Sequence, residues 1–447
     1  MSNQNETIVA PATAMGGAIA VIRLSGADAL ACCDRVFVGR KPLVQAQAYT
    51  VHYGKVVDGE RVVDDVLATV FRAPHSYTGE DSVELSCHGS AYIVQEILRL
   101  LMAAGARMAQ PGEFTIRAYM AGKMDLSQAE AVADLIACSS QAAHAMATTQ
   151  MRGGYSSKLD QLRDELLKLT ALLELELDFS EEDVEFADRE QLRLLMEQIR
   201  GEIRHLSESF SLGNVIKEGV PVAIVGQPNV GKSTLLNCLL NEQRAMVSDI
   251  AGTTRDVIEE QTKIGGVVFR FLDTAGIRHT EDRLEQMGIE RTMQSIEKAK
   301  IIIHMIDGRT LDAGTKIPVR ADQTLVTVVN KMDLAPEAAL RKDAIGISAK
   351  QGVGIDRLRE ALRQTVDTSA LYHGDVVVSH SRHYEALTAA EEALHQALMG
   401  LENGLPADLL SEDIRQVIHH IGTITGRGEI LSDEVLGHIF SKFCIGK

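Results

Sequence analysis

The sequence of 447 residues lacks any hydrophobic run long enough to cross a membrane. No apolar segment approaches the roughly 18–20 residues that a transmembrane helix needs. The first residues, MSNQNETIVAPATA, also lack the basic start and apolar core of a secretion signal. We therefore expect a soluble, cytoplasmic protein without a membrane partner.

Cysteine is scarce, and the six cysteines form no C-x-x-C pair. In a chain without an export signal, this pattern predicts reduced thiols and neither a disulfide framework nor a zinc site. The last four residues, C-I-G-K, begin at Cys444 and are a poor match to a prenylation signal. The second middle position of that signal is normally aliphatic and here is Gly, and the terminal Lys lies outside the usual set.

The chain has no excess of basic residues: it has 45 Lys and Arg and 62 Asp and Glu, which give a net charge of −17. This balance argues against sequence-blind phosphate binding over the whole surface, although a local basic patch is possible. The hydrophobic fraction of 45% is that of an ordinary globular protein. At this length we expect two to four domains.

The N-terminal part of the chain has the pattern of an α+β domain. Runs rich in β-branched residues predict strands, and AYIVQEILRLLMAAGA has the spacing of a helix. The predicted strands are 18–24, 50–57, 65–73 and 82–88, and the predicted helix is 91–106.

Downstream, apolar residues recur at helical spacing from about 121 to 213 and again from 380 to the end, while 216–370 alternates strand and helix signals. We therefore predict a multidomain protein with an α/β unit inserted into a helical bundle domain. The predicted limits are 1–120 for the α+β domain, 121–215 and 371–447 for the helical domain, and 216–370 for the inserted α/β unit.

A phosphate-binding loop is indicated by Gly226-x-x-x-x-Gly231-Lys232-Ser233, which lies between a β-rich run and a helix. The glycines let backbone N–H groups face phosphates, Lys232 supplies charge, and the Ser233 hydroxyl is a ligand for Mg²⁺. Downstream, a strand ends in Asp273-x-x-Gly276, where the carboxylate can hold the Mg²⁺ shell and the glycine N–H can meet the γ-phosphate.

The base is predicted to be guanine. In Asn330-Lys331-Met332-Asp333, the carboxylate can accept from guanine N1–H and from the 2-amino group, whereas adenine offers neither donor. Ser348-Ala349-Lys350 completes such a pocket. Four elements in this order predict GTP rather than ATP, and they identify the α/β unit at 216–370 as a P-loop (Ras-like) G domain.

Two features differ from a Ras-like switch. Ile277 follows the D-x-x-G element where Ras-type enzymes have a Gln that orients water, and no arginine finger is evident. Arg255, Arg278 and Glu285 lie in the expected mobile loops, and each is about as well explained as a solvated loop residue. Another cation must then stabilise the transition state.

Four stretches closely resemble the MnmE (TrmE) family of tRNA-modification GTPases: GTTRD at 252–256, DTAG at 273–276, PGEFTIRAYMAGKMDLSQAEAVADLI at 111–136, and the terminal FCIGK. The resemblance implies a homodimer with an N-terminal folate-binding domain. It also implies a flavoprotein partner, MnmG (GidA), in a heterotetramer that places an aminomethyl-type group at C5 of the wobble uridine of certain tRNAs. The one-carbon unit would come from a tetrahydrofolate derivative in the 5-formyl or methylene form.

The resemblance also implies roles for residues of the G domain. Thr254 would join Ser233 on Mg²⁺, and Glu285 would orient water through a second water. A K⁺ ion would take the place of an arginine finger, with its ligands at Asn229, Ser248, Ile250 and Thr253. The catalytic candidates are Glu285, Arg278 and Cys444. Motifs and resemblance together predict this GTP-binding set: Asn229, Val230, Gly231, Lys232, Ser233, Thr234, Ser248, Asp249, Ile250, Ala251, Gly252, Thr253, Thr254, Asp273, Thr274, Ala275, Gly276, Asn330, Lys331, Asp333, Ser348, Ala349 and Lys350.

The folate positions implied by the resemblance are Arg23, Glu80, Lys123 and Lys447. Cations suit the glutamate carboxylates of a folate, and Glu80 could accept a hydrogen bond from the pterin ring. For Arg23, a purely structural ion pair is the alternative.

The tail, 432–444, has the pattern of a helix with Phe440 and Cys444 on one face. Cys444 is then either a buried apolar residue or, as the resemblance implies, a residue needed for modification but not for GTP hydrolysis. The alternative to the whole interpretation is a GTP-dependent switch for ribosome assembly. Such proteins usually carry a KH domain, a second G domain or a basic tail, and none is evident here.

Overall fold

The computed structural model describes residues 6–178, 189–240, 260–272, 285–311, 317–335, 344–367, 375–426, 433–440, 443 and 446. The chain forms two compact units. The first comprises Met1–Ala133, Met151–Asp164 and Ile418–Lys447, and the second comprises Asp134–Gln150 and Glu165–Val417. In the described part of the chain, no helix is long and apolar enough to span a membrane.

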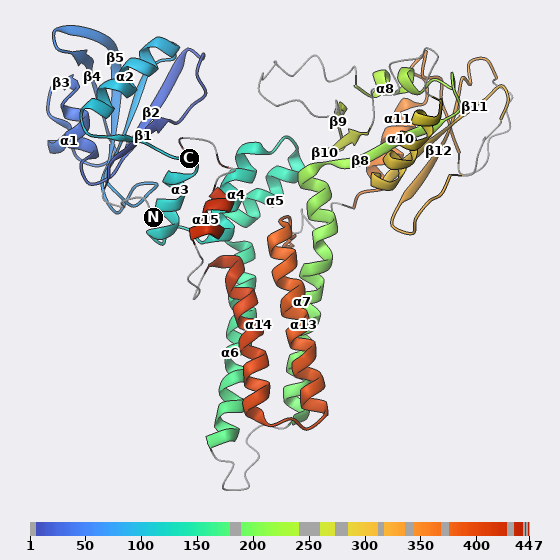
Figure 1. The fold of residues 1–447 in the computed structure, drawn as a ribbon. Coiled ribbons are helices and arrows are strands. Elements are labelled where there is room, and N and C mark those ends of the chain that lie inside the picture. The colour runs from blue at the N-terminus through green and yellow to red at the C-terminus, as the bar shows by residue number, and fades with distance from the viewer. Residues whose placement is uncertain are drawn as a thin grey trace. The chain divides into compact units, whose positions relative to one another are not determined.

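The first unit is built on a mixed sheet of seven strands, in which every neighbouring pair is antiparallel except β1 and β7. The helix α2 (Ala91–Ala103) buries Val94, Ile97 and Leu101 in the core of this sheet. Figure 1 shows α2 lying along the sheet. In spatial order the strands are β3 (Phe37–Gly39), β4 (Thr50–Asp58), β5 (Arg61–Phe71), β6 (Ser82–His88), β2 (Ile19–Ser25), β1 (Ile8–Pro11) and β7 (Arg107–Met108).

The four strands and the helix predicted in this part of the sequence are confirmed as β2, β4, β5, β6 and α2. Enrichment in β-branched residues was sufficient because such side chains pack well on the pleated surface of a sheet. The short helices were not predicted: α1 (Ala29–Asp34), the 3-10 turn η1 (Leu43–Gln45) and α3 (Glu113–Met120).

The C-terminal helix α15 (Asp433–Phe440) is shorter than predicted. The chain turns at its end, where the Phe443 N–H donates to the Phe440 carbonyl at 3.0 Å, and the two rings pack with centroids 5.1 Å apart. Both aromatic rings are buried in one cluster with Leu126 and Ala129 of α4 (Leu126–Ala137). Phe440 lies in α15, whereas Cys444 lies outside the described residues, so a shared helix face for the two stays a prediction.

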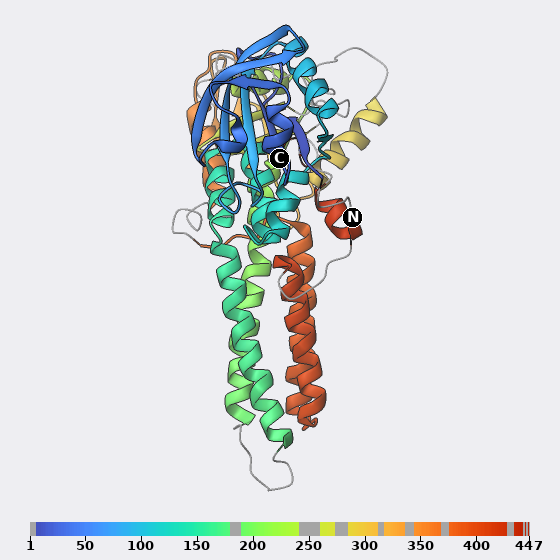
Figure 2. The ribbon, with the colours of Figure 1, turned by 90° about the vertical axis from the view of Figure 1, so that its left-hand side faces the viewer.

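The predicted long helices are present: α7 and α13 lie in the second unit, and α6 and α14 are divided between the two units. Phe210 of α7 stacks on Tyr384 of α13 at 4.7 Å between ring centroids, and Arg204 pairs with Glu391 at 2.8 Å. Figures 1 and 2 both show these helices running side by side. The four long helices are α6 (Gly154–Asp178), α7 (Arg189–Glu218), α13 (Ser381–Glu402) and α14 (Ala407–Thr425).

The second unit also holds a sheet of six strands, in which five are parallel and β9 is antiparallel. Helices α8 (Lys232–Leu240) and α11 (Ile355–Gln364) share one core with the sheet, while α10 (Glu285–Lys298) contributes Ile296 to another. In spatial order the strands are β13 (Ala344–Gly346), β12 (Thr324–Asn330), β11 (Ile301–Asp307), β8 (Val220–Gly226), β10 (Val267–Phe271) and β9 (Glu260–Ile264).

The core of this sheet includes a helix that the sequence pattern assigned to the helical domain. Ala142, Ala143 and Met146 of α5 (Gln141–Met151) belong to the same buried cluster as Ile264 and Val267 of the β9–β10 hairpin. The Ala142 N–H donates to the Gly266 carbonyl in that hairpin at 3.2 Å. Helical periodicity reveals an apolar face but not which partner covers it.

Candidate functional site

The glycine-rich loop joins the carboxyl end of β8 to the start of α8. Gly226 and Gly231 have φ of +155° and +104°, and Asn229 has φ of +59°. A Cβ on Gly231 would lie 2.3 Å from Asn330 Nδ2, so no larger residue fits there without displacement. The backbone of this loop therefore requires glycine at Gly231 for reasons of both conformation and space.

Lys232 lies at the first position of α8 and points back into the loop. Its Nζ donates to the carbonyl oxygens of Gly226 and Gln227 at 2.9 and 3.0 Å. Burial lowers the pKa of Lys232, because desolvation disfavours the charged ammonium. Ser233 and Thr234 follow in the first turn of the same helix, and Val230 is buried before it.

Asn330, at the end of β12, joins three of the predicted motifs. Its Nδ2 donates to the Val230 carbonyl at 2.8 Å, and its Oδ1 accepts from the Ala349 N–H at 2.9 Å. The side chain is 3% exposed. The glycine-rich loop, the N-K-M-D segment and the S-A-K segment therefore meet through one buried amide.

The other residues of these segments lie beside Asn330. Lys331 Nζ donates to the Asn229 carbonyl at 2.7 Å, and the Ser348 hydroxyl donates to Asp333 Oδ1 at 2.7 Å. Lys350 is exposed. Segments about 100 residues apart in the sequence meet here because the carboxyl ends of parallel strands share one edge of the sheet.

Sequence reasoning missed two residues of this site. Asp307, the last residue of β11, accepts from Lys331 Nζ at 2.8 Å. Hydrogen bonds from Arg309 and Lys331 hold its pKa well below the usual range, against the opposing effect of desolvation. Cys238 of α8 donates from Sγ to the Ala349 carbonyl at 2.8 Å. The position of Asp307 at the end of a parallel strand was a usable signal, whereas nothing in the sequence pattern singles out Cys238.

Several predicted residues lie outside the described part of the chain. The backbone of Glu285 begins α10, but its side chain is not among those described. The residues outside the description are Ser248, Asp249, Ile250, Ala251, Gly252, Thr253, Thr254, Asp273, Thr274, Ala275, Gly276, Arg278, Cys444 and Lys447.

The predicted folate positions lie in the first unit. Arg23 of β2 forms an ion pair with Glu84, through Nε at 2.9 Å and a terminal nitrogen at 2.8 Å, so the structural pairing considered for it is present. Its guanidinium also lies over the Tyr77 and Phe114 rings, 5.3 and 5.7 Å from their centroids.

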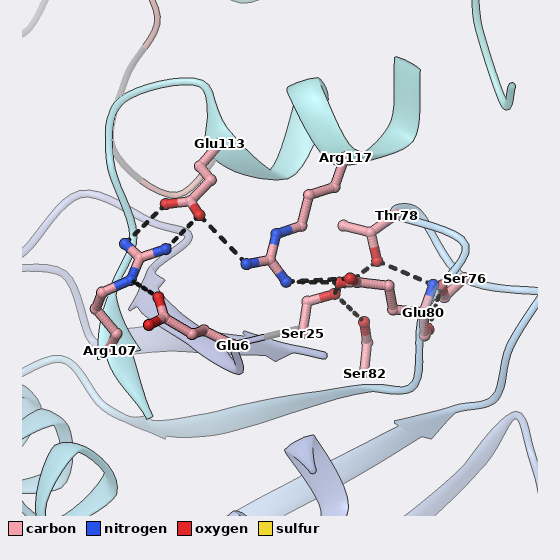
Figure 3. A network of polar contacts seen from close by, with 9 residues as sticks. All are labelled: Glu6, Ser25, Ser76, Thr78, Glu80, Ser82, Arg107, Glu113 and Arg117. Carbon is pink, nitrogen blue, oxygen red and sulfur yellow. Dashed lines mark hydrogen bonds and ion pairs between the residues drawn. The ribbon is translucent and has the colours of Figure 1, made fainter. Parts of the chain in front are cut away.

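Glu80 precedes β6, and its carboxylate is held by Arg117 of α3 and by Ser25 (Figure 3). Lys123 is exposed, and its side chain passes close to Gly79, where a Cβ would lie 3.5 Å from Lys123 Cε. Gly446 is buried against β1, because a Cβ there would lie 2.0 Å from the Pro11 carbonyl oxygen. Pro11 pairs with Ile22, the neighbour of Arg23, so Gly446 lies against the strand next to the one that carries Arg23.

The mainly parallel sheet, the glycine-rich loop and the buried amide that joins the base-recognition segments define a P-loop GTPase. Two family models match the chain: "GTP-binding protein TrmE N-terminus" over residues 7–123 and "MnmE helical domain" over residues 126–444. The chain belongs to the MnmE family of tRNA modification GTPases.

Full-length relatives agree with this assignment. The protein from Bacteroides fragilis named tRNA modification GTPase MnmE is 51% identical, and the match covers 99% of each chain. Its namesake from Christiangramia forsetii is 49% identical with the same coverage. The solved FeoB G domain from Methanococcus jannaschii is 24% identical, with 32% of this chain and 96% of that chain covered, at a TM-score of 0.23, which is too low to support a conclusion.

Proposed function

We propose that this GTPase couples GTP hydrolysis to the addition of an aminomethyl-type group at C5 of the wobble uridine of certain tRNAs. It would act with a flavoprotein of the MnmG (GidA) kind in a heterotetramer. The observation that carries the GTP part is the Asn330 amide, which bonds to Val230 in the phosphate loop and to Ala349 beside the base pocket. The tRNA part is supported by full-length relatives that are named tRNA modification GTPases.

Guanine would be recognised by Asp333. The Ser348 hydroxyl donates to one carboxylate oxygen and holds the group in place, and the carboxylate keeps acceptor sites for the two donors of guanine. Lys232 would exchange the carbonyl oxygens of its own loop for phosphate oxygens. Because those carbonyls hold a partly desolvated ammonium, a phosphate offers it a stronger, charge-assisted partner.

The donor groups at the phosphate loop suit hard cations. The Ser233 hydroxyl would hold Mg²⁺ together with Thr254, and the Asn229 side-chain amide would hold K⁺ with Ser248, Ile250 and Thr253. Lys331 bonds to the backbone carbonyl of Asn229 and not to its side chain. Asn229 is exposed, so its side-chain amide would be accessible to a cation. Bound there, the cations would neutralise charge on the phosphates, while Glu285 would orient water and Arg278 would be a further catalytic candidate.

A tetrahydrofolate derivative, in the 5-formyl or methylene form, would bind in the first unit. Three contacts connect the residues expected to bind it. Arg23 lies over Tyr77, and the Tyr77 hydroxyl bonds to Thr115 of α3 at 2.9 Å. Arg117, also in α3, bonds to Glu80. Lys123 and the tail, with Cys444 and Lys447, complete the proposed site. The donor set fits a folate, since it offers cations for the glutamate carboxylates and a carboxylate for the N–H groups of the pterin.

The homodimer is supported by one face of the N-terminal sheet. Tyr53 and Leu67 lie opposite each other on β4 and β5 and are 65% and 45% exposed, and Val51 on the same face of β4 is 58% exposed. Clustered apolar side chains on an open sheet face are typical of an interaction surface.

We also propose the domain division given above, with the G domain at 216–370, the helical domain at 121–215 and 371–447, and the folate domain at 1–120. The long helices α7 and α13 flank the G domain in sequence and pack on each other, which supports an insertion.

The test is mass spectrometry of wobble-uridine nucleosides in tRNA from cells that lack this protein. Cells are complemented with the wild type, with Asp333→Asn, or with Cys444→Ser. We expect the modified nucleoside to disappear in the deletion and to return only with the wild type. Unchanged nucleosides in the deletion strain would refute the role in tRNA modification, and full restoration by Cys444→Ser would refute a functional thiol.

A further inference from the structure

Five charged side chains of alternating sign form a continuous row in the first unit (Figure 3). The row starts at Glu6, and its first link is the 2.7 Å contact from Arg107 Nε to Glu6 Oε2. Arg107 then forms a two-point contact with Glu113, at 2.6 and 3.1 Å, and Arg117 joins Glu113 at 3.3 Å to Glu80 at 3.1 Å.

The middle of this row is buried and has little freedom. Glu113 is 5% exposed and Arg117 is 8% exposed. Desolvation would raise the pKa of Glu113, but hydrogen bonds from Arg107 and from the Gln110 N–H outweigh it and hold that pKa below its usual value. Because Arg107 and Gln110 anchor Glu113, Glu113 in turn fixes one end of the Arg117 guanidinium. The other end faces Glu80.

The hydrogen bonds around Glu80 have a defined direction. A carboxylate only accepts, so Ser25 must give its single hydroxyl proton to Glu80 Oε2, at 2.7 Å. Thr78 and Ser82 must then donate to Ser25, at 2.6 and 3.1 Å. Figure 3 shows these hydroxyls gathered on one side of the carboxylate and Arg117 on the other.

This arrangement leaves Glu80 with unused capacity at one atom. Oε2 accepts from both Ser25 and Arg117, whereas Oε1 accepts from Arg117 alone among the described residues. Each carboxylate oxygen offers about two acceptor sites. The Glu80 side chain is 26% exposed, so a ligand can reach it.

We propose that Arg117 is the positioning residue of the folate site: anchored by Glu113, it holds Glu80 so that Oε1 faces an N–H donor of the pterin ring. The inference rests on the proposed folate function. Arg117 itself does not contact the ligand. Its contribution is preorganisation, since a carboxylate held by two partners loses less freedom when it binds a third.

A contribution to stability alone does not explain why this row of charged residues is present. Breaking a buried ion pair is costly, but well-packed apolar residues often stabilise a fold as well as such a pair does. What apolar residues cannot do is orient a carboxylate at a surface that a ligand can reach.

The experiment measures equilibrium binding of 5-formyltetrahydrofolate, and of the fragment p-aminobenzoylglutamate, to the full-length chain. The variant is Arg117→Gln, and the matched control is Arg99→Gln, which removes exposed ion pairs to Glu96 and Asp58 in the same domain. We expect Arg117→Gln to weaken folate binding about tenfold to a hundredfold, as for the loss of a charged hydrogen bond. The fragment lacks the pterin and should bind to wild type and variant alike.

Equal weakening for folate and fragment would show a general structural defect and overturn the inference, as would unchanged folate affinity. A wild-type chain that does not bind folate would instead overturn the proposed folate function itself, so the two failures are distinguishable. A double-mutant cycle adds a second readout: in a Glu80→Gln background, Arg117→Gln should cost at most about twofold.

The GTPase rate, which depends on the other unit, should be the same in every variant. If Arg117→Gln does not fold, Glu113→Gln keeps the size of the anchor and removes its charge. Glu113→Gln should weaken folate binding by a few-fold and leave the affinity for the fragment unchanged. Arg117→Lys should bind folate more tightly than Arg117→Gln does, because the lysine ammonium can still reach Glu80. If Glu113→Gln does not weaken folate binding selectively and Arg117→Lys recovers no affinity, a positioning role for Arg117 is contradicted.

Discussion

The Asn330 amide provides the sharpest test of the nucleotide site. Asn330→Ala removes a side chain that is 3% exposed and leaves the Val230 carbonyl and the Ala349 N–H without their partner. A buried polar group that loses its partner costs about 1–3 kcal/mol, so the two groups together cost about 2–6 kcal/mol. Both groups belong to loops that must be ordered when GTP binds.

The cost should therefore appear mainly in the affinity for GTP. Even the lower end, about 2 kcal/mol, corresponds to a dissociation constant about 30-fold higher. The assay is titration of the full-length chain with a fluorescent GTP analogue. The matched control is Asn403→Ala, which removes an exposed amide that donates to the Met399 carbonyl at 2.8 Å at the end of α13.

Asn403→Ala should change the dissociation constant less than twofold, because water replaces an exposed partner. Asn330→Asp is a second variant of the same size. It would place a carboxylate oxygen against the Val230 carbonyl, and two acceptors cannot bond, so it should also bind GTP weakly. If Asn330→Ala binds GTP as tightly as Asn403→Ala does, the three motifs are not joined by this amide and the reasoning fails.

Three further predictions concern base recognition, the cation and acid stability. Asp333→Asn should bind xanthosine triphosphate better than GTP in competition, since an amide can donate to the 2-oxo group of xanthine; retained GTP preference would exclude the role of Asp333. Replacing K⁺ with Na⁺ at constant ionic strength should slow GTP hydrolysis at least tenfold, and equal rates would contradict the cation site. Asp134 accepts from Lys217 and from His380, each at 2.8 Å. Desolvation would raise the pKa of Asp134, but these contacts outweigh it and hold the pKa below its usual value. A carboxyl with a lowered pKa stabilises the fold above its unfolded pKa, and that stability is lost as pH falls through the folded pKa. Asp134→Asn should therefore lower the free energy of unfolding, measured with urea at pH 7, by roughly 1–3 kcal/mol, and the gap to wild type should narrow as pH falls below about 4. A gap that is the same at pH 7 and pH 3 would count against the ion pair.

The order of the nucleotide motifs was predictable from sequence because each depends on local requirements. Gly231 is needed where φ is positive, and a β-rich run before the loop and a helix after it are visible in residue periodicity. The strands of the N-terminal sheet and the long helices were predictable for the same reason. Apolar spacing is a property of neighbouring residues in the chain.

Only the tertiary structure decided which distant residues meet. Asn330 bonds to Val230 across 100 positions, and Arg117 reaches Glu80 across 37. The place of α5 in the core of the G domain, and the turn that ends α15 at Phe440, likewise depend on which surface covers an apolar face. Such pairings follow from packing of the whole chain, so the sequence alone determined the chemistry of this GTPase, and the fold decided how its groups are held.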